Sequence, residues 1–138
     1  MFLAKADFNT HIYAELIDVI QRNDDTVLNA AMAAAESEAT GYLSRYDTDT
    51  LFALAGENRD PALLMRVKDI AAWHFVTLAN ADISIELRKT RYDEAISWLK
   101  DVQSGKSHMK DWPLPVEAEP GDNDIIKVSS RTRRDTNW

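Results

Sequence analysis

An apolar seam in residues 26–46 constrains the fold of this chain more than any other feature of its sequence. Apolar side chains recur there in steps of four, three, four, three and four residues: Leu28, Met32, Ala35, Ala39, Tyr42 and Tyr46. A mean step of about 3.5 residues brings these side chains to one side of an α-helix. The alanines in the same segment favour a helix and allow a neighbouring helix to approach closely. We therefore predict a helix over 26–46 that packs against other helices.

Two further segments carry apolar stripes with clear boundary signals. Residues 61–79 begin with Pro61, a proline at the first helical position, and Asp60 before it is a capping residue. Residues 86–104 end at Gly105, a residue type that often terminates helices. The pattern over residues 3–20 predicts one helix, or two short helices separated near Asn9–Thr10. Residues 47–60 are expected to interrupt the succession of helices. The expected fold is all-α: a compact bundle of four to five helices spanning residues 1–105. The predicted core comprises Met32, Ala35, Tyr42, Val67, Ile70, Phe75, Tyr92, Ile96 and Leu99.

Residues 106–138 lack this regularity. Three prolines and a glycine fall within residues 112–124, a composition that excludes a helix. Only residues 125–130, IIKVSS, predict a short β-strand, and a lone strand needs a partner. We predict an extended C-terminal arm over 106–138 that another chain orders. The alternative, that the arm folds back on its own bundle, stays open at this point.

The charge of the chain is unevenly distributed. The formal net charge is −7, and residues 1–105 carry all of it. The last twelve residues, 127–138, hold four basic side chains against Asp135 alone, a net +3. An acidic body disfavours general nucleic-acid binding, whereas the basic tip suits a negative partner such as the body of a sister subunit. No apolar run is long enough to cross a membrane, and the chain has no cysteine.

Candidate reactive side chains do not form a known catalytic or metal-binding pattern. The three histidines, His11, His74 and His108, lie on separate segments, and His74 on an apolar face is expected to be a hydrogen-bonded core or interface residue. The aspartates at 47–49 and 122–124 lack the spacing of a calcium loop, so we expect solvated turns there. Glycine-rich phosphate loops and nucleophile motifs are missing from the sequence. We expect no enzymatic activity, no metal and no cofactor.

Three blocks of the sequence resemble a tailed-phage family, the Mu-type head–tail joining (neck) proteins of phages and prophages. The blocks are residues 33–47, 63–75 and 91–106. The residues of the first and third blocks that carry the resemblance are Glu38, Tyr42, Leu43, Arg45, Tyr46, Arg91, Tyr92, Trp98, Leu99 and Gly105. In the second block they are Leu63, Asp69, Ile70 and Ala71. The third block, Y-x-x-A-x-x-W-L ending at G-K, is the most specific of the three.

The resemblance implies a structural virion protein, without enzymatic activity, that forms a ring between the portal of the capsid and the tail. Expected partners are the portal protein, a tail-side neck or tail-completion protein and further copies of the chain. DNA would at most pass through the ring. The expected location is the head–tail interface of the virion, and the host cytoplasm before assembly. The predicted arm contacts are Trp112, Ile125, Ile126, Val128, Arg131, Arg133, Arg134 and Trp138. The alternative is a small helical binding or regulatory module of a prophage that acts through its basic tip.

Overall fold

The computed structural model describes residues 2–10, 25–78 and 85–116, and the regular secondary structure of these residues is helical, without a β-strand among them. The helices are η1 (Lys5–Thr10), α2 (Asp25–Tyr42), α3 (Thr48–Ala53), η2 (Gly56–Asn58), α4 (Pro61–Leu78) and α5 (Ile85–Ser104). The prediction of an all-α fold is therefore confirmed. The predicted strand over 125–130, and most of the predicted N-terminal helix, lie outside the described residues.

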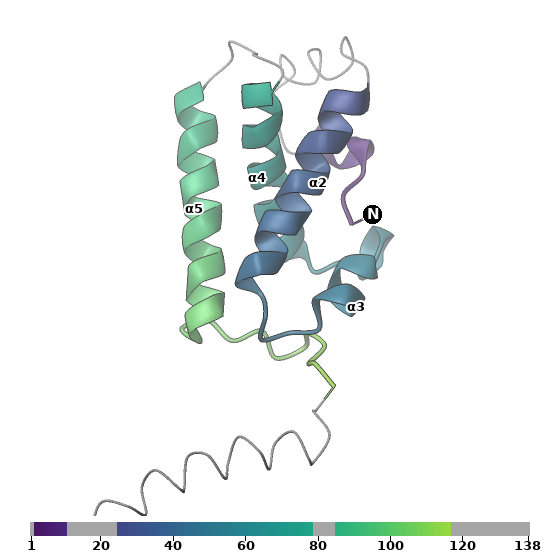
Figure 1. Cartoon of the computed structure of the whole chain (residues 1–138), viewed down its shortest axis with the longest axis vertical. Helices are drawn as coiled ribbons and strands as arrows, with labels where there is room; N and C mark the ends of the chain where they lie inside the picture. Colours follow the sequence, from purple (N-terminus) through teal and green to yellow (C-terminus); the bar gives the residue numbers. More distant parts are fainter. Residues whose placement is uncertain (1, 11–24, 79–84, 117–138) are drawn as a thin grey trace, which may run out of the picture.

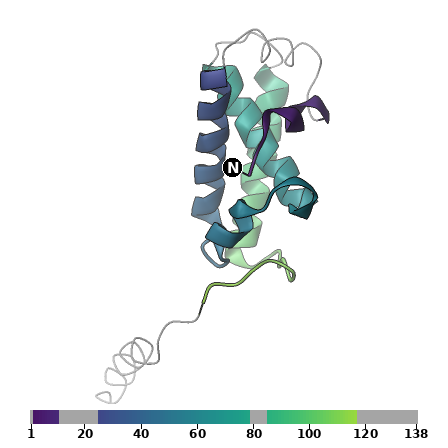
Figure 2. The same cartoon turned by 90° about the vertical axis from the view of Figure 1, so that its right-hand side faces the viewer.

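The three long helices α2, α4 and α5 form a bundle in which α4 packs against both of the others (Figure 1). The short helix α3 lies near the lower end of the bundle, and the N-terminal segment 2–10 runs along its side (Figure 2). Half of the residues of α4 are buried, including Leu63, Val67 and Phe75. This burial follows from its position, because a helix with neighbours on two sides must be apolar on a broad face.

The core matches the residues expected from the apolar periodicity. Six of the nine predicted core residues are at most 2% exposed: Met32, Ala35, Val67, Ile70, Phe75 and Leu99. The other three, Tyr42, Tyr92 and Ile96, are partly buried and pack against the core. The N-terminal segment adds Phe2, Leu3 and Phe8, each at most 2% exposed. The stripes on the three long helices therefore do face one another.

Two predicted boundaries near the lower end of the bundle are wrong. The helix predicted over 26–46 ends at Tyr42, and the backbone then turns, with Tyr46 N–H donating to Leu43 O at 3.0 Å. Tyr46 is nonetheless 5% exposed, because it is buried from the turn rather than from a helix. The predicted interruption at 47–60 contains α3, which begins where the Asp47 side chain accepts a hydrogen bond from Thr50 N–H at 3.2 Å. Burial of Leu51 holds this short helix against the body.

The C-terminal arm does not leave the body at residue 106 as predicted. Residues 107–113 pass beneath the lower ends of α2 and α5 (Figure 1), and Trp112 is only 6% exposed. Asp47 N–H donates to Pro113 O at 2.9 Å, which ties this segment to the start of α3. We call residues 107–113 the strap. The open alternative of a fold-back therefore holds for the strap, whereas residues 117–138 lie outside the described part of the chain.

Candidate functional site

A partly exposed carboxylate, that of Glu38, joins all three long helices. Glu38 of α2 accepts a hydrogen bond from the Tyr92 hydroxyl of α5 at 2.6 Å, through Oε2. Its other oxygen, Oε1, lies 2.8 Å from His74 Nε2 of α4. The hydrogen bond predicted for His74 is confirmed, and its side chain is partly buried. Each of the three resembling blocks thus supplies one member of this cluster.

The surroundings of Tyr92 hold its hydroxyl in the protonated, donating form. Burial and the hydrogen bond to Glu38 raise the pKa of Tyr92 well above its usual range, and burial makes the larger contribution. The ring of Trp73 lies 6.0 Å from that of Tyr92, and Lys89 Nζ lies 5.5 Å from the Tyr92 ring centroid. Since the hydroxyl is held as a donor, this arrangement suits a fixed tie between helices better than a proton-transferring group.

At the lower end of the bundle, two residues of the resembling blocks meet through space. Gly105 terminates α5 with φ of +87°, a conformation that favours glycine. A Cβ atom at this position would lie 2.7 Å from Arg45 Nη1, so the guanidinium of Arg45 rests against the glycine. The missing side chain therefore serves two purposes: it permits the turn and makes room for Arg45.

Aromatic rings hold the strap in the same region. The Trp112 ring centroid lies 5.0 Å from that of Tyr46 and 6.1 Å from that of Trp98, both in edge-on arrangements. Met109 N–H also donates to the Tyr46 hydroxyl at 3.1 Å. Edge-on aromatic pairs contribute roughly 0.5–1.5 kcal/mol each beyond the area that they bury. Trp112, predicted to contact another subunit, therefore packs within its own chain.

Shallow hollows surround the strap. One of about 280 Å³ is lined by residues of α3, the segment before α4 and the strap: Leu51, Leu54, Asn58, Arg59, Asp60, Pro61, Asp111, Trp112 and Pro113. A second, of about 240 Å³, shares Asp60, Asp111 and Trp112 with it. A third, of about 260 Å³, is lined by Arg45, Tyr46, His108 and Leu114. All three are smaller than the roughly 300–1,000 Å³ of a typical small-molecule pocket.

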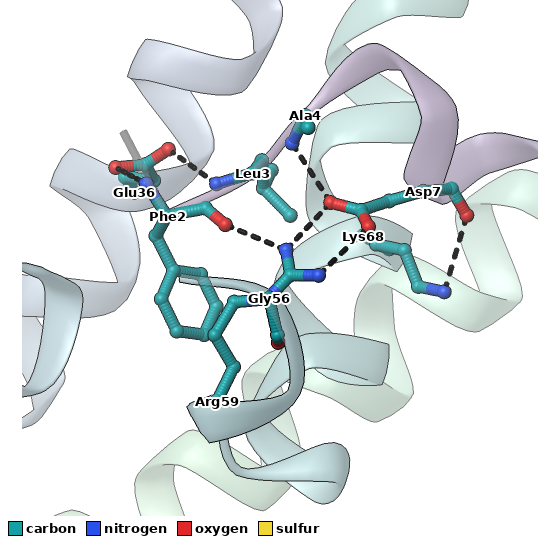
Figure 3. A network of polar contacts seen from close by, with 8 residues as sticks. All are labelled: Phe2, Leu3, Ala4, Asp7, Glu36, Gly56, Arg59 and Lys68. Atoms are coloured by element: carbon teal, nitrogen blue, oxygen red, sulfur yellow. Dashed lines mark hydrogen bonds and ion pairs between the residues drawn. The ribbon is translucent and has the colours of Figure 1, made fainter. Parts of the chain in front are cut away.

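A network of polar contacts fastens the N-terminal segment to the body (Figure 3). Arg59 donates to both carboxylate oxygens of Asp7, at 2.7 and 2.9 Å, and to Phe2 O at 2.7 Å. Glu36 of α2 accepts from Leu3 N–H at 3.1 Å, and Lys68 of α4 donates to Asp7 O at 3.3 Å. We call Asp7, Arg59 and these partners the N-terminal clamp.

The electrostatics of the clamp favour the charged forms of its central pair. Burial acts to raise the pKa of Asp7, but the hydrogen bonds from Arg59 and from Ala4 N–H outweigh it, and the pKa is lowered. The hydrogen bond to Asp7 raises the pKa of Arg59. Burial lowers the pKa of Lys68. Sequence inspection missed this clamp, because Asp7 and Arg59 are 52 positions apart and belong to no local pattern.

The remaining residues predicted from the resemblance are placed as follows. Leu43 and Leu99 are buried in the core, Tyr42 packs against it, and Arg91 is exposed on α5. The predicted arm contacts Ile125, Ile126, Val128, Arg131, Arg133, Arg134 and Trp138 lie outside the described residues.

Within residues 2–10, 25–78 and 85–116, no group of three or more histidine or carboxylate side chains is arranged to hold a metal ion. In the same part of the chain, no helix is both long and apolar enough to cross a membrane.

Comparison with known proteins identifies the family. The family model described as "Bacteriophage Mu, Gp36" matches residues 5–125, which include the three blocks, the central pair of the clamp and the strap. No curated protein and no solved structure matches the chain. The match covers most of the chain and agrees with the resemblance carried by residues 33–47, 63–75 and 91–106. The chain is therefore a phage protein and belongs to the bacteriophage Mu Gp36 family.

Proposed function

We propose that this protein is a structural component of the virion, a head–tail connector subunit that forms a ring between the portal and the tail. Its partners would be the portal protein, a tail-side neck or tail-completion protein and neighbouring copies of itself. Membership in a bacteriophage Mu family supports a role in the phage particle or its assembly. We propose that the chain acts without catalysis, as a rigid element that joins larger assemblies.

The observation that carries this proposal is the use that the fold makes of its motif residues. Glu38 and Tyr92 tie helices together, and Arg45 covers the glycine at the end of α5. Trp98 helps to hold the strap through Trp112. These side chains form their hydrogen bonds and packing contacts with other residues of the same body. A motif used in this way preserves a shape, which is what a subunit held between two assemblies requires.

The strap adds a second supporting feature, because it sets where the rest of the chain departs. Trp112 and the bond between Asp47 N–H and Pro113 O anchor the strap at the lower end of the bundle. Leu114 and Val116 beyond it are 67% and 93% exposed. Large apolar side chains left in solvent favour burial against another molecule. We propose that residues from 114 onward contribute to contacts with the ring or with its partners.

The direct test is a phage whose gene for this protein is disrupted. We expect such a phage to produce filled heads and separate tails that do not join, and wild-type protein supplied from a plasmid should restore infectious particles. Mass spectrometry of purified wild-type virions should detect the protein, and labelling should place it at the head–tail interface. Complete, infectious particles without the protein would refute the proposal.

A truncated variant tests the contribution of the arm separately. Deleting residues 125–138 should leave the thermal transition of the body nearly unchanged, because the described core lies within residues 2–116. The same deletion should abolish the assembly of infectious particles. A large loss of thermal stability would instead show that the deleted residues stabilise their own body.

Size measurements of the full chain with and without assembled portal should show a monomer or weak oligomer alone and a ring on the portal.

Binding to duplex DNA distinguishes the connector from the alternative function, a regulatory module that acts through its basic tip. Binding that weakens steeply with salt concentration is the signature of contacts to phosphate groups. Tight, salt-dependent binding by the isolated full chain would support the alternative. We expect weak binding, since the body carries the net charge of −7.

A further inference from the structure

The strap, α3 and the segment before α4 line a shallow hollow for which the described residues supply no occupant. We call it the Trp112 hollow and define it by Leu51, Leu54, Asp60, Asp111, Trp112 and Pro113. We propose that it receives the C-terminal tip, residues 131–138, of a neighbouring copy of this protein. This inference rests on the proposed function in one respect, namely that copies of the chain lie side by side.

The size and lining of the Trp112 hollow suit side chains of another polypeptide. Its volume is about 280 Å³, just below the roughly 300–1,000 Å³ of small-molecule pockets. Leucine, proline and tryptophan side chains supply the apolar part of its wall. Among the described residues, Trp112 Nε1 is a buried donor without an acceptor. Because this atom has almost no accessible surface, an occupant of the hollow would contact other atoms of the Trp112 side chain.

The rim of the Trp112 hollow is acidic. Two carboxylates, those of Asp60 and Asp111, line the hollow together with one basic side chain, Arg59. The charge of Arg59 does not offset them, because its guanidinium binds Asp7 at 2.7 Å in the N-terminal clamp. The strap contributes the exposed Asp111 next to Lys110. A positively charged segment is therefore the complementary occupant.

The C-terminal tip has the matching chemistry. Residues 131–138, RTRRDTNW, contain three arginines, one aspartate and a tryptophan. Arginine binds carboxylates through two parallel hydrogen bonds, and arginine and tryptophan are among the residue types that most often dominate binding energy at interfaces. The arginines would lie at the acidic rim formed by Asp60 and Asp111, while Trp138 would contact the apolar wall.

The path of the chain favours a neighbour over the same copy. Pro113 and Pro115 restrict the backbone to extended conformations, and Leu114 and Val116 are largely exposed. The chain up to residue 116 leads away from the bundle (Figure 2). Residues 117–138 number 22 and can span up to roughly 70 Å when extended. The 20-residue helix α5 is only about 30 Å long, so the tip can reach past its own body. In a ring, the next body stands within that reach.

Disulfide trapping tests the proposal, and the chain is suited to it because it contains no natural cysteine. One full-length copy carries Lys110→Cys beside the hollow, and a second, differently tagged copy carries Thr136→Cys in the tip. The matched control replaces the first change with Lys89→Cys, another exposed lysine, near the opposite end of α5. After mixing at a protein concentration high enough to populate the weak oligomer, followed by mild oxidation, we expect at least tenfold more cross-linked product between copies for Lys110→Cys than for Lys89→Cys.

Two further variants sharpen the test. Asn58→Cys, at another residue that lines the hollow, should also cross-link to the copy that carries Thr136→Cys, which guards against a local disturbance at position 110. Replacing Arg131, Arg133 and Arg134 with glutamine in the tip-bearing copy should lower the yield to that of the control. Circular dichroism of each variant confirms that the helical body is intact.

Three outcomes would overturn the inference: equal yields at positions 110 and 89, no product at 110 or 58, or yields that do not depend on the arginines. A chain carrying both Lys110→Cys and Thr136→Cys adds a fourth. If its disulfide forms only within one chain at every protein concentration, the tip occupies its own hollow.

None of these outcomes decides whether the protein is a connector, which depends on its location in the virion. Conversely, absence from the virion would refute the connector and leave the trapping result intact.

Discussion

Replacing Gly105 with alanine should destabilise the protein by about 2–3 kcal/mol. The first part of the cost is conformational: φ is +87°, and placing a Cβ in the left-handed region costs about 1–2 kcal/mol. The second part is steric, because the new Cβ would meet Arg45 Nη1 at 2.7 Å. The guanidinium is the end of a flexible side chain and can shift, so we assign it about 1 kcal/mol, the lower end of overpacking costs.

Two other glycines provide matched controls for the same substitution. Gly56 has φ of +61° and open space where a Cβ would lie, so Gly56→Ala should carry only the conformational cost of about 1–2 kcal/mol. Gly41 lies within α2 and also has open space, so Gly41→Ala should stabilise the protein by about 0.5–1 kcal/mol through helix propensity. The series therefore predicts opposite signs for one chemical change.

The assay is urea denaturation followed by far-ultraviolet circular dichroism and by tryptophan fluorescence. Coincident transitions for the two probes justify a two-state free energy of unfolding. In an Arg45→Ala background, the cost of Gly105→Ala should fall to about that of Gly56→Ala, because only the conformational part remains. An unchanged cost in that background would show that Arg45 does not lie against Gly105. A neutral Gly105→Ala would refute the left-handed turn itself.

The remaining predictions concern the core, the inter-helix tie and the N-terminal clamp. Leu99→Ala should cost roughly 2–5 kcal/mol in the same urea assay, because Leu99 is fully buried, and a loss below about 1 kcal/mol would contradict its core position. Tyr92→Phe should cost roughly 1–2 kcal/mol by removing the hydrogen bond to Glu38, and a smaller loss should follow in a Glu38→Ala background, where the bond is already gone. The lowered pKa of Asp7 contributes stability that is present above its ordinary value of 3.8 and is lost as the pH falls through the lower folded value. Arg59→Gln should reduce this acid sensitivity, and an unchanged stability profile below pH 3.8 would contradict the pairing.

The sequence predicted the three long helices well because the signals for them are local. An apolar step of 3.5–3.6 residues shows which side of a helix is buried, whatever the partner. The boundary residues act within a single turn: Asp60 Oδ2 accepts from Leu63 N–H at 2.9 Å, and Gly105 ends α5. The expectation for His74 also rested on a local feature, its apolar neighbours, although the sequence did not name Glu38 as the partner.

Local signals failed where distant contacts decide the structure. The spacing of Tyr46 fits the seam of α2, yet the chain turns at residues 43–46, and Trp112 packs on Tyr46 from the strap. The short helix α3 would be marginal in isolation, because a helix of six residues cannot offset the cost of nucleation. It persists because Asp47 caps it and Leu51 is buried by the rest of the body.

The sequence by itself thus determined the helical class, the long helices and the buried faces, since each depends on residues within a few turns of one another. Only the tertiary structure decided that Arg59 binds Asp7 across 52 positions and that the strap returns to the body. It also decided that Glu38 joins three helices. Such pairings depend on which surfaces meet after the helices have packed, and the free energy that selects them arises from burial and hydrogen bonding between segments that no local pattern connects.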